Sequence, residues 1–194
     1  TVEKYGVILE NEHAAEAHIY AVLRNVSGKR LPIQTVQMKA VGANGKALHE
    51  ERYVSHLPDV IEPGETMIVS EWMYDFTKDI GSGIEITVET STRAYTRWTR
   101  LDGVRAWREG QYLCVELTNT TEETLYGAVC GAILEDADGR ILDAMMQSAY
   151  ATEDMGLLPG SSVIWRKRLE DSATLEIGTG ELTCEAWAYR IEEI

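Results

Sequence analysis

Short alternations of apolar and polar residues run along most of the chain and predict β-strands. Two segments show the period most clearly, with apolar residues on one face at Ile19, Ala21, Leu23 and at Leu113, Val115, Leu117. Turn residues separate such segments at roughly ten-residue intervals, which is typical of a β-sandwich. We therefore predict an all-β chain with six or seven short strands in each half.

The second organising feature is an internal repeat. Residues 23–48 and 117–142 align without a gap at an offset of 94, and the Pro-Gly pairs at 63–64 and 159–160 align at an offset of 96. At the centre of each copy lie Asn44-Gly45 and Asp138-Gly139, dipeptides that favour two-residue hairpin turns because both positions need φ > 0. We predict two β-sandwich domains, 1–100 and 101–194, joined near 99–102.

The alternation also predicts which strand faces form the two cores. In the first copy these residues are Val36, Met38, Ala40, Met67, Val69, Met73, Ile84, Ile86 and Val88. In the second copy they are Cys130, Ala132, Leu134, Val163, Trp165, Leu182, Cys184 and Ala186. We expect the fourth segments, 48–56 and 142–152, to be strands as well.

Composition excludes several classes of protein. The net charge is -14, from 32 acidic and 18 basic residues, which argues against nucleic-acid binding because phosphates would be repelled. No apolar run reaches the length of about 18 residues that a membrane span needs. Cys114, Cys130 and Cys184 lack CxxC spacing and are expected to be small buried apolar residues, with a Cys130–Cys184 disulfide left open.

Catalytic and metal-binding motifs are not found in the sequence. The histidines at 13, 18, 49 and 56 form neither HExxH nor an i, i+4 pair, and we expect them on surface strands or loops. Gly81-Ser82-Gly83 lacks the G-x-S-x-G frame. The acidic turn 135–139 does not fit an EF-hand, although a looser calcium site there stays open. We predict no catalytic residues, no metal site and no cofactor.

Two Asn-x-Ser/Thr sequences occur at equivalent positions of the repeat, beginning at Asn25 and Asn119. They fit N-glycosylation sites. They also fit turns in which the asparagine side chain bonds the nearby backbone, and we favour that interpretation.

Aromatic and basic residues supply the candidate binding site. Trp72, Tyr74 and Phe76 share one strand face, opposite to the predicted core face. A second group surrounds the junction and consists of Arg93, Tyr95, Arg97, Trp98, Arg100, Arg105, Trp107 and Arg108. Packing between the two domains is the favoured interpretation. The alternative is a protein or glycan surface, with Trp72, Tyr74, Phe76, Arg97, Trp98 and Trp107 as candidate binding residues.

The second repeat resembles the FxLYD-type modules of bacterial envelope proteins. The resemblance rests on Ile133, Leu134, Asp136, Asp138, Gly139, Arg140, Leu142, Pro159, Gly160 and Trp165. Glu135 departs from it, because the family usually has an aromatic residue there, and the first repeat departs further at 41–43. The resemblance implies an immunoglobulin-like fold, an extracytoplasmic setting at the bacterial cell surface or after secretion, and no catalytic activity.

The resulting hypothesis is a tandem pair of immunoglobulin-like β-sandwiches that binds a protein or glycan in the bacterial envelope. The alternative is a structural spacer that presents another domain, and an enzyme is the third and weakest hypothesis. We expect a monomer or weak dimer with no nucleic-acid partner. Any targeting signal or anchor would lie upstream of Thr1.

Overall fold

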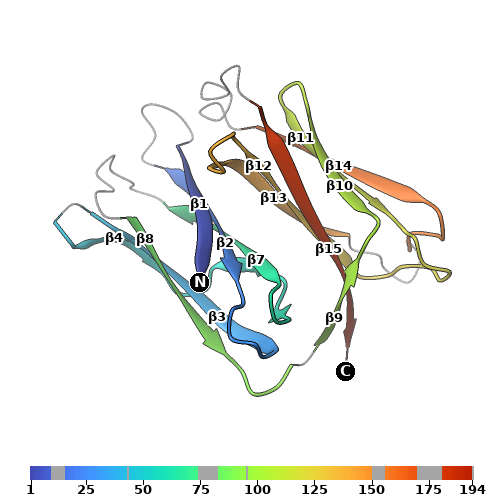
Figure 1. Cartoon of the computed structure of the whole chain (residues 1–194), viewed down its shortest axis with the longest axis horizontal. Coiled ribbons are helices and arrows are strands. Elements are labelled where there is room, and N and C mark those ends of the chain that lie inside the picture. Colours follow the sequence, from blue (N-terminus) through green and yellow to red (C-terminus); the bar gives the residue numbers. More distant parts are fainter. Residues whose placement is uncertain are drawn as a thin grey trace. The chain divides into compact units, whose positions relative to one another are not determined.

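The computed structural model describes residues 1–9, 16–42, 44–73, 83–94, 96–149, 156–169 and 181–193 (Figure 1). In this part of the chain the regular secondary structure is entirely β-strand, arranged in four antiparallel sheets. Within the same residues, no helix is long and apolar enough to cross a membrane.

The chain divides into two compact units, with the boundary after Ala94. The first unit contains β1 (Val2–Leu9), β2 (Ala17–Arg24), β3 (Leu31–Val41), β4 (Ala47–Glu51), β5 (Ser55–Leu57), β6 (Val60–Ile61), β7 (Thr66–Met73) and β8 (Gly83–Thr90). The second contains β9 (Thr96–Leu101), β10 (Val104–Glu109), β11 (Tyr112–Thr118), β12 (Ala128–Glu135), β13 (Ile141–Ala149), β14 (Ser162–Arg168) and β15 (Thr183–Glu193).

Each unit has two sheets. In the first unit one sheet has the order β1-β2-β7-β5, and the other is built on β3, which pairs with β4 and β6 and also with β8. In the second unit the sheets have the orders β10-β11-β14 and β13-β12-β15-β9. The central strand β2 thus lies between β1 and β7, as β11 lies between β10 and β14 (Figure 1).

The predicted core faces are confirmed in both units. In the first unit the buried cluster includes Val36, Met38, Ala40, Met67, Val69 and Met73, with Ile84, Ile86 and Val88 packed against it. In the second unit it includes Leu113, Val115, Leu117, Cys130, Ala132 and Leu134, with Val163, Trp165, Leu182, Cys184 and Ala186 packed against it. Period-two alternation was therefore sufficient to assign the inner face of these strands.

The hairpin between β12 and β13 differs from the predicted two-residue turn. Asp136 N–H donates to Arg140 O (3.1 Å) and Gly139 N–H donates to Asp136 O (3.0 Å), so three residues lie between the paired positions 136 and 140. Gly139 has φ of 77°, as expected for the glycine that follows a type I turn in a three-residue hairpin loop. The carboxylate of Asp136 supports the loop by accepting from the N–H groups of Asp138 and Arg140.

Two other expectations need correction. The predicted strand 48–56 is divided into β4 and β5, because Arg52 and Tyr53 turn the chain and their N–H groups donate to the carboxylate of Glu51. The three cysteines are free, so the open Cys130–Cys184 disulfide is not formed.

Gly139→Val should destabilise the second unit by about 1–3 kcal/mol, because a β-branched residue adopts the left-handed conformation only at a cost. No atom lies within 4 Å of a Cβ built on Gly139, so the backbone conformation alone carries this effect. Denaturant unfolding monitored by hydrogen exchange in β12 and β13 measures it. Gly139→Asn is the control and should lie near the parent, since asparagine tolerates positive φ. Equal stability of the valine variant and the parent would contradict the turn assignment.

Candidate functional site

The outer face of the sheet β10-β11-β14 is the strongest candidate surface. Residues that lie opposite each other on the three strands form three rows across this face, 105–116–164, 107–114–166 and 109–112–168. We call it the Trp107 face, and its residues are Arg105, Trp107, Glu109, Tyr112, Cys114, Glu116, Ile164, Arg166 and Arg168. Tyr112 and Ile164 are 44% and 47% exposed, and Trp107 is half-buried. Apolar and aromatic groups are therefore presented among charges.

Charged groups on the Trp107 face pair with each other. Arg105 forms an ion pair with Glu116, and its guanidinium carbon lies 5.0 Å from the centre of the Trp107 ring. Arg166 bonds the carboxylate of Glu109 (3.1 Å). Because the arginine already occupies one face of the indole, Trp107 is better placed to contact a protein through its edge and open side than to stack on a sugar ring.

Trp72 lies on the outer face of β7, as predicted, and is half-buried there. Its indole stacks on the His18 ring of the neighbouring β2, with 4.2 Å between ring centres. Tyr74 and Phe76 lie outside the described residues, so the expectation that all three aromatics share a patch stays a prediction.

The surface position predicted for His18 is wrong, since this residue is only 8% exposed. Its Nε2 is 2.6 Å from Ser70 Oγ, and its Nδ1 is 2.7 Å from the hydroxyl of Tyr20. A Ser-His pair is one element of a hydrolase site. However, a phenol at Nδ1 stabilises an imidazolium less well than the carboxylate of a triad does. We therefore interpret this cluster as a polar network within a buried sheet face and not as a hydrolase site.

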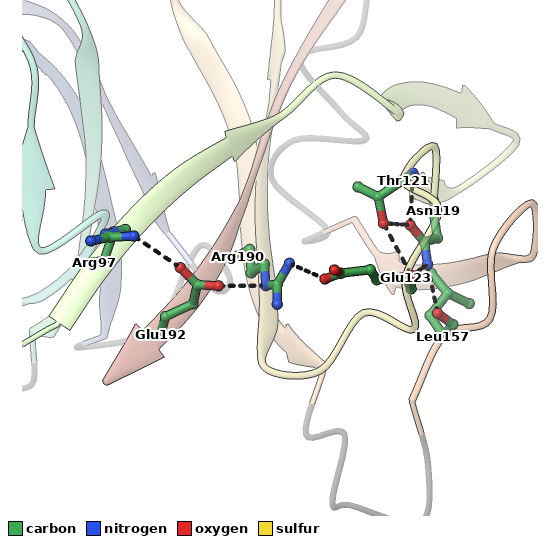
Figure 2. A network of polar contacts seen from close by, with 7 residues as sticks. All are labelled: Arg97, Asn119, Thr121, Glu123, Leu157, Arg190 and Glu192. Carbon is green, nitrogen blue, oxygen red and sulfur yellow. Dashed lines mark hydrogen bonds and ion pairs between the residues drawn. The ribbon is translucent and has the colours of Figure 1, made fainter. Parts of the chain in front are cut away.

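Arg97 and Trp98, both on β9, point to opposite sides of their sheet. Arg97, whose side chain is 65% exposed, begins a chain of alternating charges that continues through Glu192 and Arg190 to Glu123 (Figure 2). Trp98 is half-buried, packs edge-on against Tyr189 and donates from Nε1 to Thr96 Oγ1 (2.9 Å). Trp98 and Tyr189 thus belong to one aromatic cluster, whereas Arg97 belongs to the series of ion pairs.

The asparagines of the two Asn-x-Ser/Thr sequences hold equivalent loops in place through side-chain hydrogen bonds. Asn119 Nδ2 donates to Glu123 O (2.8 Å) and Leu157 O (2.7 Å), while its Oδ1 accepts from Thr121 N–H and Thr121 Oγ1 (Figure 2). Asn25 makes the same set of bonds with Lys29, Ile61 and Ser27. Both amide nitrogens are engaged and both asparagines are buried, which supports the turn interpretation over glycosylation.

The cysteine thiols are poor nucleophiles in this environment. Burial raises the pKa of Cys130 to about 12, and it also raises the pKa values of the Cys114 and Cys184 thiols. Only the thiolate is a strong nucleophile. These three residues therefore stay protonated at neutral pH and give no support to thiol-based catalysis.

A cluster that the sequence analysis missed lies in the first unit. One ligand atom from each of His49, Glu51 and Glu71 lies within 4.8 Å of the other two. His49 and Glu51 are two residues apart on β4, and Glu71 comes from β7 of the other sheet. A search for helical i, i+4 pairs misses this arrangement, because side chains on one strand face are two residues apart. The pattern His-x-Glu in β4 was one available sequence signal.

Comparison with known proteins identifies no family. A scan against models of protein families finds no match, and no curated protein matches the chain.

Asn119→Ala should destabilise the second unit by about 2–4 kcal/mol, because it removes the two hydrogen bonds that Asn119 Nδ2 donates and the two that its Oδ1 accepts. Hydrogen exchange in β11 and β14 measures the loss. Thr120→Ala, at an exposed position of the same loop, is the control and should have little effect. If both variants had the stability of the parent, the asparagine would not be locking the loop.

Trp72→Ala should lower the stability of the first unit by about 1–3 kcal/mol, since a half-buried ring stacked on a buried histidine is removed. Trp72→Phe keeps an aromatic ring over His18 and should lose less. Thermal unfolding of the two variants and the parent measures both effects. A melting temperature of Trp72→Ala equal to that of the parent would place Trp72 on a freely exposed patch.

Proposed function

We propose that this chain is a non-catalytic binding module of the bacterial envelope, built from two copies of one immunoglobulin-like β-sandwich. The Trp107 face would be its contact with a protein partner. The observation that carries the proposal is the grouping of the half-buried Trp107 with exposed tyrosine, isoleucine and arginine side chains on that face. Tryptophan, tyrosine and arginine are the residues most enriched among interface hot spots.

Equivalent positions in the two units support the repeat. Pairing of Ala40 with His49 corresponds to pairing of Leu134 with Asp143, at the offset of 94 found in the sequence. Gly64 and Gly160 have φ of 79° and 73°, and each donates to the carbonyl of its loop asparagine, Asn25 or Asn119. The strand pairing and the loop hydrogen bond are thus the same at these aligned positions, which supports the proposed repeat.

The outer faces differ between the units, which is what a division of roles would require. The face of unit 1 that corresponds to the Trp107 face carries Tyr20, Val22 and Ile68, and all three are buried. In the second unit the equivalent residues are Cys114, Glu116 and Ile164. The envelope setting rests on the resemblance to FxLYD-type modules alone.

A structural spacer is the second candidate. It is favoured by the ion pairs Arg105–Glu116 and Arg166–Glu109, because charges that satisfy one another suit a face that contacts only water. A partner would then have to be sought elsewhere, or would not exist.

The test uses a photo-crosslinking residue in place of Ile164 on the full chain in envelope extracts. The control places it at Thr87, which is exposed on β8 of the other unit. A protein crosslinked from the first position and not from the second is purified, and its Kd is measured by calorimetry. Trp107→Ala should weaken binding by about tenfold or more, with little effect of Tyr53→Ala, which alters an exposed aromatic elsewhere.

Equal crosslinking from both positions, or an unchanged Kd for Trp107→Ala, would contradict the binding role of this face. Absence of any specific crosslink would favour the spacer. Binding of purified chain to a glycan array that depends on Trp107 would instead assign a sugar ligand.

A further inference from the structure

Each unit carries polar side chains at one inner position, just beyond its core. In the second unit this position holds a cross-sheet ion pair, in which Lys167 Nζ donates to Asp143 Oδ1 (2.5 Å) and to Ala144 O (3.1 Å). Asp143 is fully buried and lies opposite Leu134 on the neighbouring strand β12. Lys167 belongs to the other sheet and lies opposite Leu113 on β11. A cation is therefore held between the sheets of this unit.

The first unit has different residues at the same register. His49 lies opposite Ala40 on β3, and Glu71 lies opposite Ile19 on β2. Both Ala40 and Ile19 are core residues. Counting back by 94 and by 96 from Asp143 and Lys167 leads to His49 and Glu71. A carboxylate thus replaces the ammonium group, and an imidazole replaces the carboxylate.

Glu51 adds a second carboxylate. Its Oε1 accepts from the N–H groups of Arg52 (2.7 Å) and Tyr53 (3.0 Å), so its position is fixed by the backbone. Among the described residues no lysine or arginine pairs with either carboxylate. The position therefore has an excess of negative charge that a cation would neutralise.

The imidazole gives an independent indication. His49 Nε2 is buried, and it has no hydrogen-bond partner among the described residues. Leaving a buried polar nitrogen unpaired is unfavourable, because it has lost its bonds to water. A ring nitrogen of His49 belongs to the same cluster as carboxylate oxygens of Glu51 and Glu71, so one ligand could satisfy all three side chains.

We propose that His49, Glu51 and Glu71 bind a divalent transition-metal ion of the zinc type. One imidazole nitrogen and two carboxylate oxygens suit zinc, with a water as the fourth ligand, whereas calcium and magnesium prefer all-oxygen sites. Ligand distances of about 2.0–2.2 Å around a tetrahedral ion place the ligand atoms about 3.3–3.6 Å apart. The three atoms lie within 4.8 Å of one another, so binding requires them to move closer together.

The ion would connect β4 with β7, that is, one sheet of the first unit with the other. It would take the part that Lys167 plays in the second unit, since both neutralise carboxylate charge between the sheets. This site is separate from the Trp107 face and does not depend on the proposed binding function.

The test is calorimetric titration of the tag-free full chain with Zn²⁺ after treatment with a chelator. We expect one ion per chain and a higher melting temperature of the first unit with zinc. Glu71→Gln and His49→Gln should each weaken zinc affinity by about tenfold or more. Glu50→Gln is the matched control, since Glu50 lies between the ligands on β4 but faces the other way, and it should leave affinity unchanged.

Circular dichroism establishes that each variant is folded before its affinity is compared. Glu71→Lys supplies the ammonium of the second unit, and it should abolish zinc binding while the fold is retained. No zinc binding by the parent, or equal affinity of Glu71→Gln, His49→Gln and the parent, would overturn the proposal. Binding of Ca²⁺ more tightly than Zn²⁺ would overturn the assigned class of metal.

Discussion

The alternation of side chains along each strand limits where chemistry can occur in this protein. In both units one face of every central strand is committed to a core, and these inner faces contain alanine, valine, leucine, isoleucine and methionine almost throughout. Polar groups can then lie on outer faces, in loops, or at inner positions beyond the end of the core. The Trp107 face, the asparagine loops and the His49 cluster occupy these three kinds of place.

The loops that join the sheets depend on asparagine side chains. Loop carbonyl groups need donors, and the buried Asn25 and Asn119 each supply donors and an acceptor from a single side chain. The same bonds hold the loops to the residue that precedes each Pro-Gly turn by two positions, Ile61 or Leu157. These asparagines therefore fix how the chain passes from one sheet to the other. Ser27 and Thr121, two residues further on, donate a hydroxyl hydrogen bond to the asparagine Oδ1, and this accounts for the resemblance to a glycosylation motif.

The sequence was sufficient for the core faces of the main strands, because period two depends only on neighbouring residues. It was not sufficient for every strand, since 48–56 is divided into β4 and β5. Met67, Val69 and Met73 could be placed in the core without knowledge of the partner strands. The burial of His18 could also have been anticipated. The segment 17–23 is apolar at nearly every position, and such a run is typical of a strand covered on both faces. The surface prediction for His18 was based on its residue type, and the composition of the strand was the better guide.

The His49 cluster could not be predicted in the same way, because it depends on which strands of the two sheets come close to each other. Glu71 is separated from His49 by β5 and β6 in the sequence, and only the packing of two sheets brings them together. Alignment of the two halves does identify the position, since His49 and Glu71 fall opposite Asp143 and Lys167. At this position the second unit holds a buried ion pair, and the first unit holds an imidazole with two carboxylates. The lysine side chain neutralises the buried carboxylate of the second unit. In the first unit the proposed metal ion would supply the corresponding positive charge from solution.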